Sequence, residues 1–341
     1  MSRTVLVLAC VCLAESHTVP IHHRRLSSNH ESTVDGGVSQ GYIYTTVLLG
    51  KNRDPFSVIL DTGSPLTIVP CQPCDDCGDH AKFRPDHALK EEFGIHYVEG
   101  SSLEGRYTQT SVWVSGTRVK YTIGCASRMT RLFKEQSVDG IMGLDEAPTS
   151  IVQQLRYAHK DTPWNTFTLH LTAESDHLIV GRNPDEEEYD ARCPLFKSEN
   201  NYYIRFLSLD MQGTRSHVSL GVSDRRMLID SGTTFLYLER GLFTKVKQEL
   251  RRYGFTTGER GGIGCVSIAF SKLPTLLIRG VDGCSIRLKP TQYAYASFGR
   301  VCIGIHDTGW GNDNTFGLIA MDERRTTFVL ETPQYVLFRD L

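Results

Sequence analysis

The sequence lacks a strong charge excess, and beyond its first residues it lacks a long apolar run. Its 37 Lys and Arg nearly balance 39 Asp and Glu, giving a formal net charge of −2, and basic residues form no extended block. Nothing therefore points to nucleic acid or an anionic membrane surface as a partner. No segment after residue 16 reaches the roughly 18 apolar residues of a spanning helix, so no stable membrane span is expected.

The N-terminus does carry a short apolar run, at residues 5–14, preceded by Arg3 and followed by small and polar residues. This arrangement is typical of a signal peptide and predicts that residues 1–16 are removed. Residues 17–40 then form a short N-terminal or pro segment, whose basic stretch HHRRL (22–26) is expected to be a solvated arm. The predicted location is the lumen of the secretory pathway (ER or Golgi) or the outside of the cell.

Helical patterning is also scarce. Only residues 149–157 and 240–253 have apolar residues at helical spacing. Short segments rich in Val, Ile, Thr and aromatic residues, separated by Gly, Asp and Asn, predict β-strands instead. They lie at 42–50, 56–63, 66–70, 111–116, 118–125, 166–173 and 177–181. The predicted fold class is mostly β.

An internal repeat divides the chain into two halves. VILDTGS (58–64) and MLIDSGT (227–233) share an apolar run, an Asp, a Ser or Thr, a Gly and a further Ser or Thr. Each copy is followed by a triplet ending in Gly, IMG (141–143) and TFG (315–317). Similar half-molecules predict an N-terminal lobe over 41–182 and a C-terminal lobe over 183–341, joined near an acidic stretch.

Each half thus places one carboxylate where a strand enters a turn, at Asp61 and at Asp230. Two carboxyls a few ångströms apart cannot both ionise easily, so the pair shares one proton. The ionised member can act as general base on a water molecule, and the protonated member can donate to a scissile carbonyl. The residues expected to support the pair are Thr62, Gly63, Ser64, Ser231, Gly232 and Thr233.

The two motifs, with VDGIMGL (138–144) and YYIRFLSL (202–209), resemble the pepsin-type aspartic proteases, family A1, over residues 41–338. The resemblance implies a bilobal fold with a cleft between pseudo-symmetric β lobes and a flap hairpin from the N-terminal lobe. It also implies a monomeric endopeptidase acting on polypeptides with no cofactor and no metal.

The flap of that family is expected around IHYVEGSSLEG (95–105), where Tyr97 matches the flap tyrosine. Tyr97, Glu99 and Gly100 are the expected flap and substrate-binding residues. The tryptophan common after the first motif is absent from this sequence, and Thr67, Ile68 and Val69 stand in its region. A usual hydrogen-bond partner of the flap tyrosine is therefore missing.

Ten cysteines are present, and eight remain without Cys10 and Cys12 of the signal segment. Cys71, Cys74, Cys77 and His80 have the spacing of a zinc or iron–sulfur ligand set, but a secretory chain favours disulfides. Two disulfides are expected among the first four of the eight, and the other four are expected to pair within the second lobe. Spacing leaves the pairing open. The candidates are Cys71, Cys74, Cys77, Cys125, Cys193, Cys265, Cys284 and Cys302.

The cysteine cluster and flap also resemble the plasmepsin V-like branch, which cuts exported proteins after an Arg-x-Leu motif. Glu99 matches an acidic flap residue that helps to receive the arginine in that branch, and a carboxylate suits a guanidinium. Met129 and Thr130 stand where a second acidic residue is expected, and the sequence predicts no membrane anchor like that of the branch.

Two other functions remain open from the sequence. A catalytically inactive, pepsin-like binding protein would be expected to lack a catalytic Asp or the flap tyrosine, and this chain keeps all three. A secreted metal-binding or redox protein built on the cysteine cluster would leave the duplicated Asp motifs unexplained.

Overall fold

The computed structural model describes residues 17–24, 41–87, 91–97, 100–114, 117–158, 165–172, 174–181, 188–213, 217–258, 261–309 and 313–341. The predicted signal peptide and most of the predicted pro segment lie outside these residues. The first ten strands are β1 (His17–Arg24), β2 (Tyr42–Leu49), β3 (Asp54–Asp61), β4 (Ile68–Pro70), β5 (Glu92–His96), β6 (Ser102–Val114), β7 (Thr117–Met129), β8 (Gly140–Gly143), β9 (Thr166–Leu171) and β10 (Asp176–Val180).

The later strands belong mainly to the C-terminal half. They are β11 (Ala191–Pro194), β12 (Phe196–Ser198), β13 (Asn201–Gln212), β14 (His217–Ile229), β15 (Leu236–Leu238), β16 (Thr275–Gly280), β17 (Ser285–Leu288), β18 (Ala294–Ser297), β19 (Arg300–Ile303), β20 (Ile305–Asp307), β21 (Asn314–Phe316), β22 (Arg324–Val329) and β23 (Tyr335–Asp340).

Helices are few among the described residues, as the sequence predicted. They are α1 (Leu132–Glu135), α2 (Ile151–Ala158) and α3 (Arg240–Leu250), with short 3₁₀ turns η2 (Arg251–Tyr253), η4 (Phe270–Lys272), η5 (Pro290–Gln292) and η6 (Leu318–Ala320). The predicted helices at 149–157 and 240–253 correspond to α2 and to α3 with η2. The one-turn α1 was not predicted, because four residues are too few to show a helical period.

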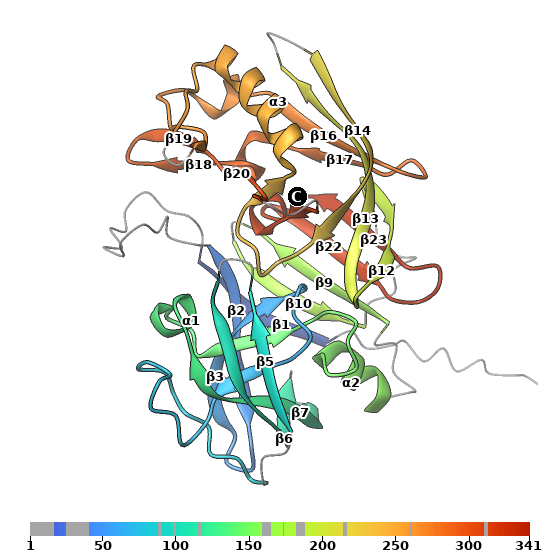
Figure 1. Cartoon of the computed structure of the whole chain (residues 1–341). Coiled ribbons are helices and arrows are strands. Elements are labelled where there is room, and N and C mark those ends of the chain that lie inside the picture. The colour runs from blue at the N-terminus through green and yellow to red at the C-terminus, as the bar shows by residue number, and fades with distance from the viewer. Residues whose placement is uncertain are drawn as a thin grey trace, which may run out of the picture.

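The strands form two large sheets, and this mostly-β, bilobal architecture confirms the predicted fold class (Figure 1). Within the described residues, a 13-stranded sheet has the order β11-β23-β22-β9-β10-β1-β2-β3-β8-β4-β7-β6-β5. An 8-stranded sheet contains β17-β16-β13-β14-β21-β15-β20 with β12 beside β13, and β18 pairs with β19. The first sheet joins the two halves, because β9 pairs with β22.

The strand β1 corrects one expectation. Residues 22–26 were expected to be a solvated arm, but His22, His23 and Arg24 pair with Tyr44, Ile43 and Tyr42 of β2. The preceding residues of β1 pair with β10, so β1 lies inside the large sheet. The expectation was wrong for residues 22–24. Charge and a lack of apolar alternation said nothing about a strand that is held by backbone pairing, first with β10 and then with β2.

Both halves build their Asp motif in the same way. Strand β3 runs parallel to β8, with Asp61 opposite Gly143, and β14 runs parallel to β21, with Ile229 opposite Phe316. Val58 and Leu60 are buried on β3, and Met227 and Ile229 are buried on β14. These apolar residues place the two strands in the interior, so each strand carries its Asp from the core to the junction of the halves.

Among the described residues, four disulfides cross-link the fold. Cys71–Cys125 and Cys74–Cys77 lie in the N-terminal half, and Cys193–Cys284 and Cys265–Cys302 lie in the C-terminal half. No helix in the part of the chain that the structure describes has the length and apolar character needed to cross a bilayer.

Candidate active site

The two turns meet so closely that each glycine packs against the opposite carboxyl. A Cβ added at Gly63 would lie 2.9 Å from Oδ1 of Asp230, and one added at Gly232 would lie 2.3 Å from Cγ of Asp61. Only a residue without a side chain permits this approach. Asp61 and Asp230 are 5 % and 9 % exposed, so the pair is nearly withdrawn from water.

Each carboxyl accepts two hydrogen bonds from its own turn. The Gly63 amide donates to Oδ1 of Asp61 at 2.7 Å, and the Ser64 hydroxyl donates to Oδ2 at 2.5 Å. In the second turn, the Gly232 amide donates to Oδ1 of Asp230 at 2.9 Å. The Thr233 hydroxyl donates to its Oδ2 at 2.5 Å. The two side chains are therefore held in fixed and nearly equivalent orientations.

Thr62 and Ser231 connect the two turns by hydrogen bonds. The Thr62 amide donates to Oγ of Ser231 at 3.1 Å, and the Ser231 amide donates to Oγ1 of Thr62 at 2.9 Å. Each hydroxyl also donates across the junction, Thr62 to the carbonyl of Ile229 and Ser231 to the carbonyl of Leu60. Every polar group of this buried cross-link is paired, which makes the relative position of the two halves specific here.

The electrostatics of the pair favour a single shared proton. Burial, followed by the charge of Asp230, raises the pKa of Asp61 well above its ordinary value. The hydrogen bond from Ser64 opposes this shift without cancelling it. Because the two carboxyls interact strongly, their protons leave in two separate steps that belong to the pair. One acid and one base can therefore coexist at this site over a range of pH.

Tyr97 reaches the site from the turn between β5 and β6. Its amide donates to the carbonyl of Ser101 at 2.9 Å, and its hydroxyl oxygen lies 3.3 Å from Oγ of Ser64. Ser64 in turn donates to Asp61, so a hydroxyl pair connects the flap with the dyad. Ser64 thus contacts the tyrosine although the usual tryptophan is absent. Gly100 lies in the same turn, whereas Glu99 lies outside the described residues.

The sequence interpretation missed three residues near the dyad. Asp145 is 2 % exposed, its amide donates to the carbonyl of Ser64 at 3.2 Å, and burial raises its pKa to about 7. Phe133 packs against Tyr97 with ring centroids 5.0 Å apart. Burial, followed by the charge of Asp313, raises the pKa of Tyr203, and the charge of Asp230 makes the smallest contribution. The sequence signal for Asp145 was an acidic residue directly after the buried GIMGL segment.

The cysteine cluster does not offer a thiolate site in this structure. Cys71, Cys74 and Cys77 all have their sulfur atoms in disulfides, and a metal would need them as free thiolates. The ring of His80 contacts the backbone instead, with its Nε2 2.8 Å from the carbonyl oxygen of Phe133.

Each of the two β-rich lobes contributes one buried carboxyl to the same pair, and each carboxyl is hydrogen-bonded by its own turn. Residues 42–335 match the family described as eukaryotic aspartyl protease, and the chain belongs to this family.

Curated relatives are distant. Aspartic proteinase nepenthesin-1 of Nepenthes gracilis is 24% identical over 332 residues, which cover 83% of this chain and 74% of the relative. Pepsin A of Gallus gallus is 26% identical over 78% of this chain and 74% of its own length. Plasmepsin V of Plasmodium falciparum is 22% identical over 61% of this chain, which spans 49% of that relative. These identities support the family and do not single out a branch.

Proposed function

We propose that this protein is an aspartic endopeptidase in which Asp61 and Asp230 activate a water molecule for attack on a peptide bond. The observation that carries the proposal is the symmetric pair itself. Each carboxyl is buried, is oriented by one amide and one hydroxyl of its own turn, and contacts the glycine of the opposite turn.

The pKa of Asp61 is raised by burial and by the charge of Asp230, and we therefore assign the shared proton of the pair to Asp61. Asp61 holds the shared proton and donates it to the oxygen of the scissile carbonyl, while Asp230 accepts a proton from the attacking water. The water oxygen bonds to the carbonyl carbon, giving a tetrahedral diol. Collapse of the diol breaks the C–N bond as a proton passes to the leaving nitrogen, and the pair returns to one shared proton.

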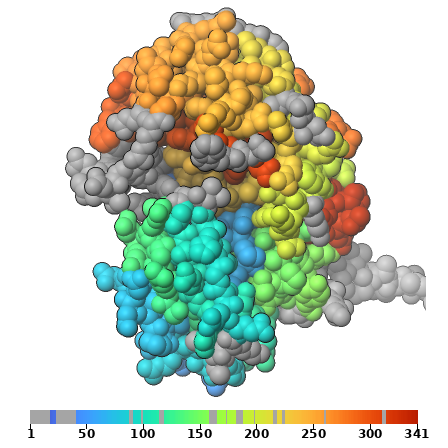
Figure 2. Space-filling view, in the orientation of Figure 1, coloured from blue at the N-terminus to red at the C-terminus, as the bar shows by residue number. Residues whose placement is uncertain are grey.

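A polypeptide needs room beside the pair. The surface is hollowed between the lower, N-terminal half and the upper, C-terminal half (Figure 2). The wall of one cavity of about 150 Å³ includes Thr234, which directly follows the dyad-supporting Thr233, and also Gly41 and Ile319. We assign this cavity to a substrate side chain. We also propose that the two lobes divide where the sequence predicts, between residues 182 and 183.

The experiment is hydrolysis of a peptide library by the wild-type chain and by Asp61→Asn and Asp230→Asn, across pH 4 to 7.5. We expect both variants to lose cleavage by more than about 1,000-fold, because acid and base act as one unit. Their circular dichroism and elution volume should match the wild type. Retained cleavage in either folded variant contradicts the mechanism. Peptide binding by the wild type without cleavage would show an inactive, pepsin-like binding protein instead.

The compartment and the specificity are part of the same proposal. Four disulfides suit the secretory pathway or the outside of the cell, where oxidised cysteines persist. One relative, from Candida albicans, is named a secreted aspartic protease. We further propose that the protein prefers substrates with an Arg-x-Leu motif. Glu99 binds the arginine of this motif through a charge-assisted hydrogen bond to its guanidinium.

Glu99→Ala tests the specificity. We expect about a 10-fold or greater loss of kcat/KM for peptides with Arg two positions before the residue at the cut, and little change for Arg-free peptides. Glu92→Ala is the matched control, since Glu92 is an exposed acid of the flap strand β5 that pairs with Arg106. An equal loss for both classes of peptide would exclude Glu99 as the arginine receptor and leave the hydrolytic proposal intact.

A further inference from the structure

The flap rests on one segment of the N-terminal lobe, residues 126–134, which covers the end of β7 and α1. The Ser102 amide at the flap donates to Oγ1 of Thr130 at 2.7 Å, and the Thr130 amide donates to the carbonyl of Ser102 at 3.1 Å. Three residues further on, the ring of Phe133 packs against Tyr97. The position of Tyr97 over the dyad therefore depends on where this segment lies.

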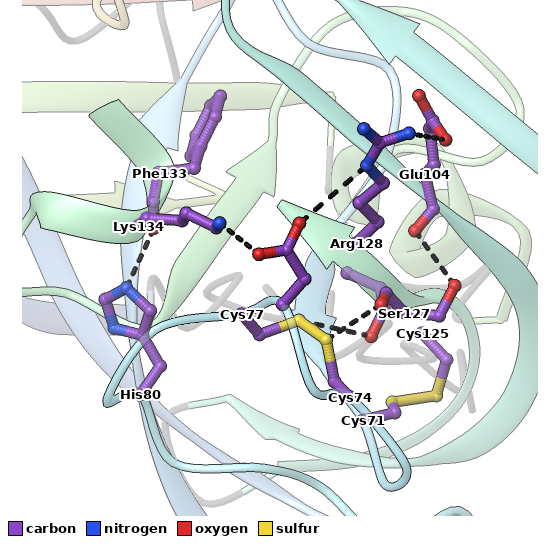
Figure 3. Close-up of a disulfide and its surroundings, with 12 residues drawn as sticks. Cys71, Cys74, Cys77, His80, Glu104, Cys125, Ser127, Arg128, Phe133 and Lys134 are labelled. Atoms are coloured by element: carbon purple, nitrogen blue, oxygen red, sulfur yellow. Dashed lines mark hydrogen bonds and ion pairs between the residues drawn. A yellow bond between two sulfur atoms is a disulfide. The ribbon is translucent and has the colours of Figure 1, made fainter. Parts of the chain in front are cut away.

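The opposite side of the same segment is covered by the cysteine loop, residues 71–80 (Figure 3). The Met129 amide donates to the carbonyl of Asp76 at 3.2 Å, and the Asp76 carboxylate forms ion pairs with Arg128 and Lys134. Arg128 also reaches Glu104 on the flap strand β6, at 3.7 Å. The loop thus contacts residues on both sides of Thr130 and Phe133.

Two disulfides hold the loop in this place. Cys71–Cys125 fastens its start to β7, and Cys74–Cys77 closes a small ring around Asp75 and Asp76. The Cys74 sulfur lies 2.9 Å from the carbonyl oxygen of Ser127, a contact without a proton because the sulfur is in a disulfide. Directly after the ring, Gly78 has a φ of +64°, and a Cβ there would lie 2.7 Å from the carbonyl oxygen of Lys134.

His80 completes the contact at Phe133 itself. Its Nε2 lies 2.8 Å from the carbonyl oxygen of Phe133, and its side chain is 7% exposed. A carbonyl can only accept, so this ring nitrogen carries the proton and donates it. On the other side of the ring, Nδ1 lies 3.9 Å from Oδ1 of Asp139, which also accepts the Ala81 amide. The imidazole therefore joins the cysteine loop to the backbone of the residue on which Tyr97 packs.

We propose that His80 is a positioning residue for the flap, and that the disulfide-held loop 71–80 is the support that makes it effective. His80 fixes Phe133, Phe133 supports Tyr97, and Tyr97 lies over Ser64 and Asp61. This gives the Cys–His motif a role in catalysis that requires no metal. The inference rests on the proposed endopeptidase activity.

The kinetic test compares His80→Ala with His80→Gln, whose amide can still donate to Phe133. We expect His80→Ala to lower kcat/KM about 10-fold, the usual worth of one buried hydrogen bond. The loss should fall mainly on KM, because the flap clamps the bound peptide and the dyad itself is unchanged. His80→Gln should recover activity to within about 3-fold of wild type. His177→Ala, on the distant strand β10, is the histidine control.

A double variant distinguishes the proposed role of His80 from a purely structural one. If His80 acts through Tyr97, the loss in His80→Ala should nearly disappear in a Tyr97→Ala background, whereas independent effects would add. Additive losses, a loss confined to kcat, or a failure of His80→Gln to restore activity would each overturn the proposal.

Hydrogen exchange of the flap tests the same proposal without catalysis. In His80→Ala, the turn amides of Tyr97 and Gly100 should exchange at least about 10-fold faster than in wild type, with core strands unchanged. Gly78→Ala should have the same effect, because its Cβ would push against Lys134. A wild type that cleaves no peptide refutes the proposed function only, and the exchange result still decides the role of His80. Unchanged flap exchange in both variants refutes that role.

Discussion

Asp145 makes the stability of this protein depend on pH in a direction that can be measured. It follows β8 by two residues, is 2% exposed, and accepts a hydrogen bond from the Ala147 amide at 2.8 Å. Burial raises its pKa from 3.8 to about 7, and the nearby charge of Glu146 adds to the shift. The folded protein therefore holds a proton on Asp145 at pH values where the unfolded chain has released it.

The sign and the size of the effect follow from linkage. Between the unfolded pKa near 3.8 and the folded pKa near 7, the folded state binds one more proton, so stability falls as pH rises. Each pKa unit is worth about 1.4 kcal/mol, so the full cost is about 4 kcal/mol and is reached near pH 7. Asp145→Asn mimics the protonated side chain and keeps the acceptor for Ala147, so it should remove this cost.

The assay is urea unfolding of Asp61→Asn and of the double variant Asp61→Asn/Asp145→Asn, between pH 4 and 7.5. The Asp61 substitution prevents self-cleavage and removes the titration of Asp61 from the comparison. We expect the two proteins to be equally stable near pH 4, and the double variant to be more stable by about 4 kcal/mol at pH 7. A difference in stability that stays constant with pH would refute the assignment of a buried, protonated Asp145.

Three further expectations concern the turns and the disulfides. Gly232→Ala should lower kcat by at least about 100-fold, since its Cβ would lie 2.3 Å from Cγ of Asp61, whereas Gly241→Ala on α3, with 3.9 Å of clearance, should not. Ser231→Ala leaves the buried Thr62 amide without its acceptor and should cost about 1–3 kcal/mol in urea unfolding. Removing Cys193–Cys284, at a separation of 91 residues, should cost about 4–5 kcal/mol by loop entropy, against about 2 for Cys74–Cys77 at a separation of 3. Equal losses from the two disulfides would contradict the entropic account.

The sequence by itself determined the features that are encoded in short, contiguous patterns. Short segments rich in apolar and β-branched residues predicted the strands β2, β3, β4, β6, β7, β9 and β10, and the repeated apolar-Asp-Thr/Ser-Gly pattern identified Asp61 and Asp230. Seven residues are enough to indicate a buried strand that ends in a turn, so the positions of the two Asp residues could be predicted from the sequence. The same patterns carried the resemblance to the family that residues 42–335 match.

The tertiary structure alone decided which distant groups meet. Cysteine pairing depends on the path of the backbone, so Cys71 with Cys125 and Cys74 with Cys77 could not be chosen from their spacing. Burial depends on neighbours from other segments, which is why the pKa of Asp145 and the contact from His80 to Phe133 were invisible in the sequence. The strand β1 was missed for the same reason, because its pairing with β10, far along the chain, and with β2 holds it in the sheet.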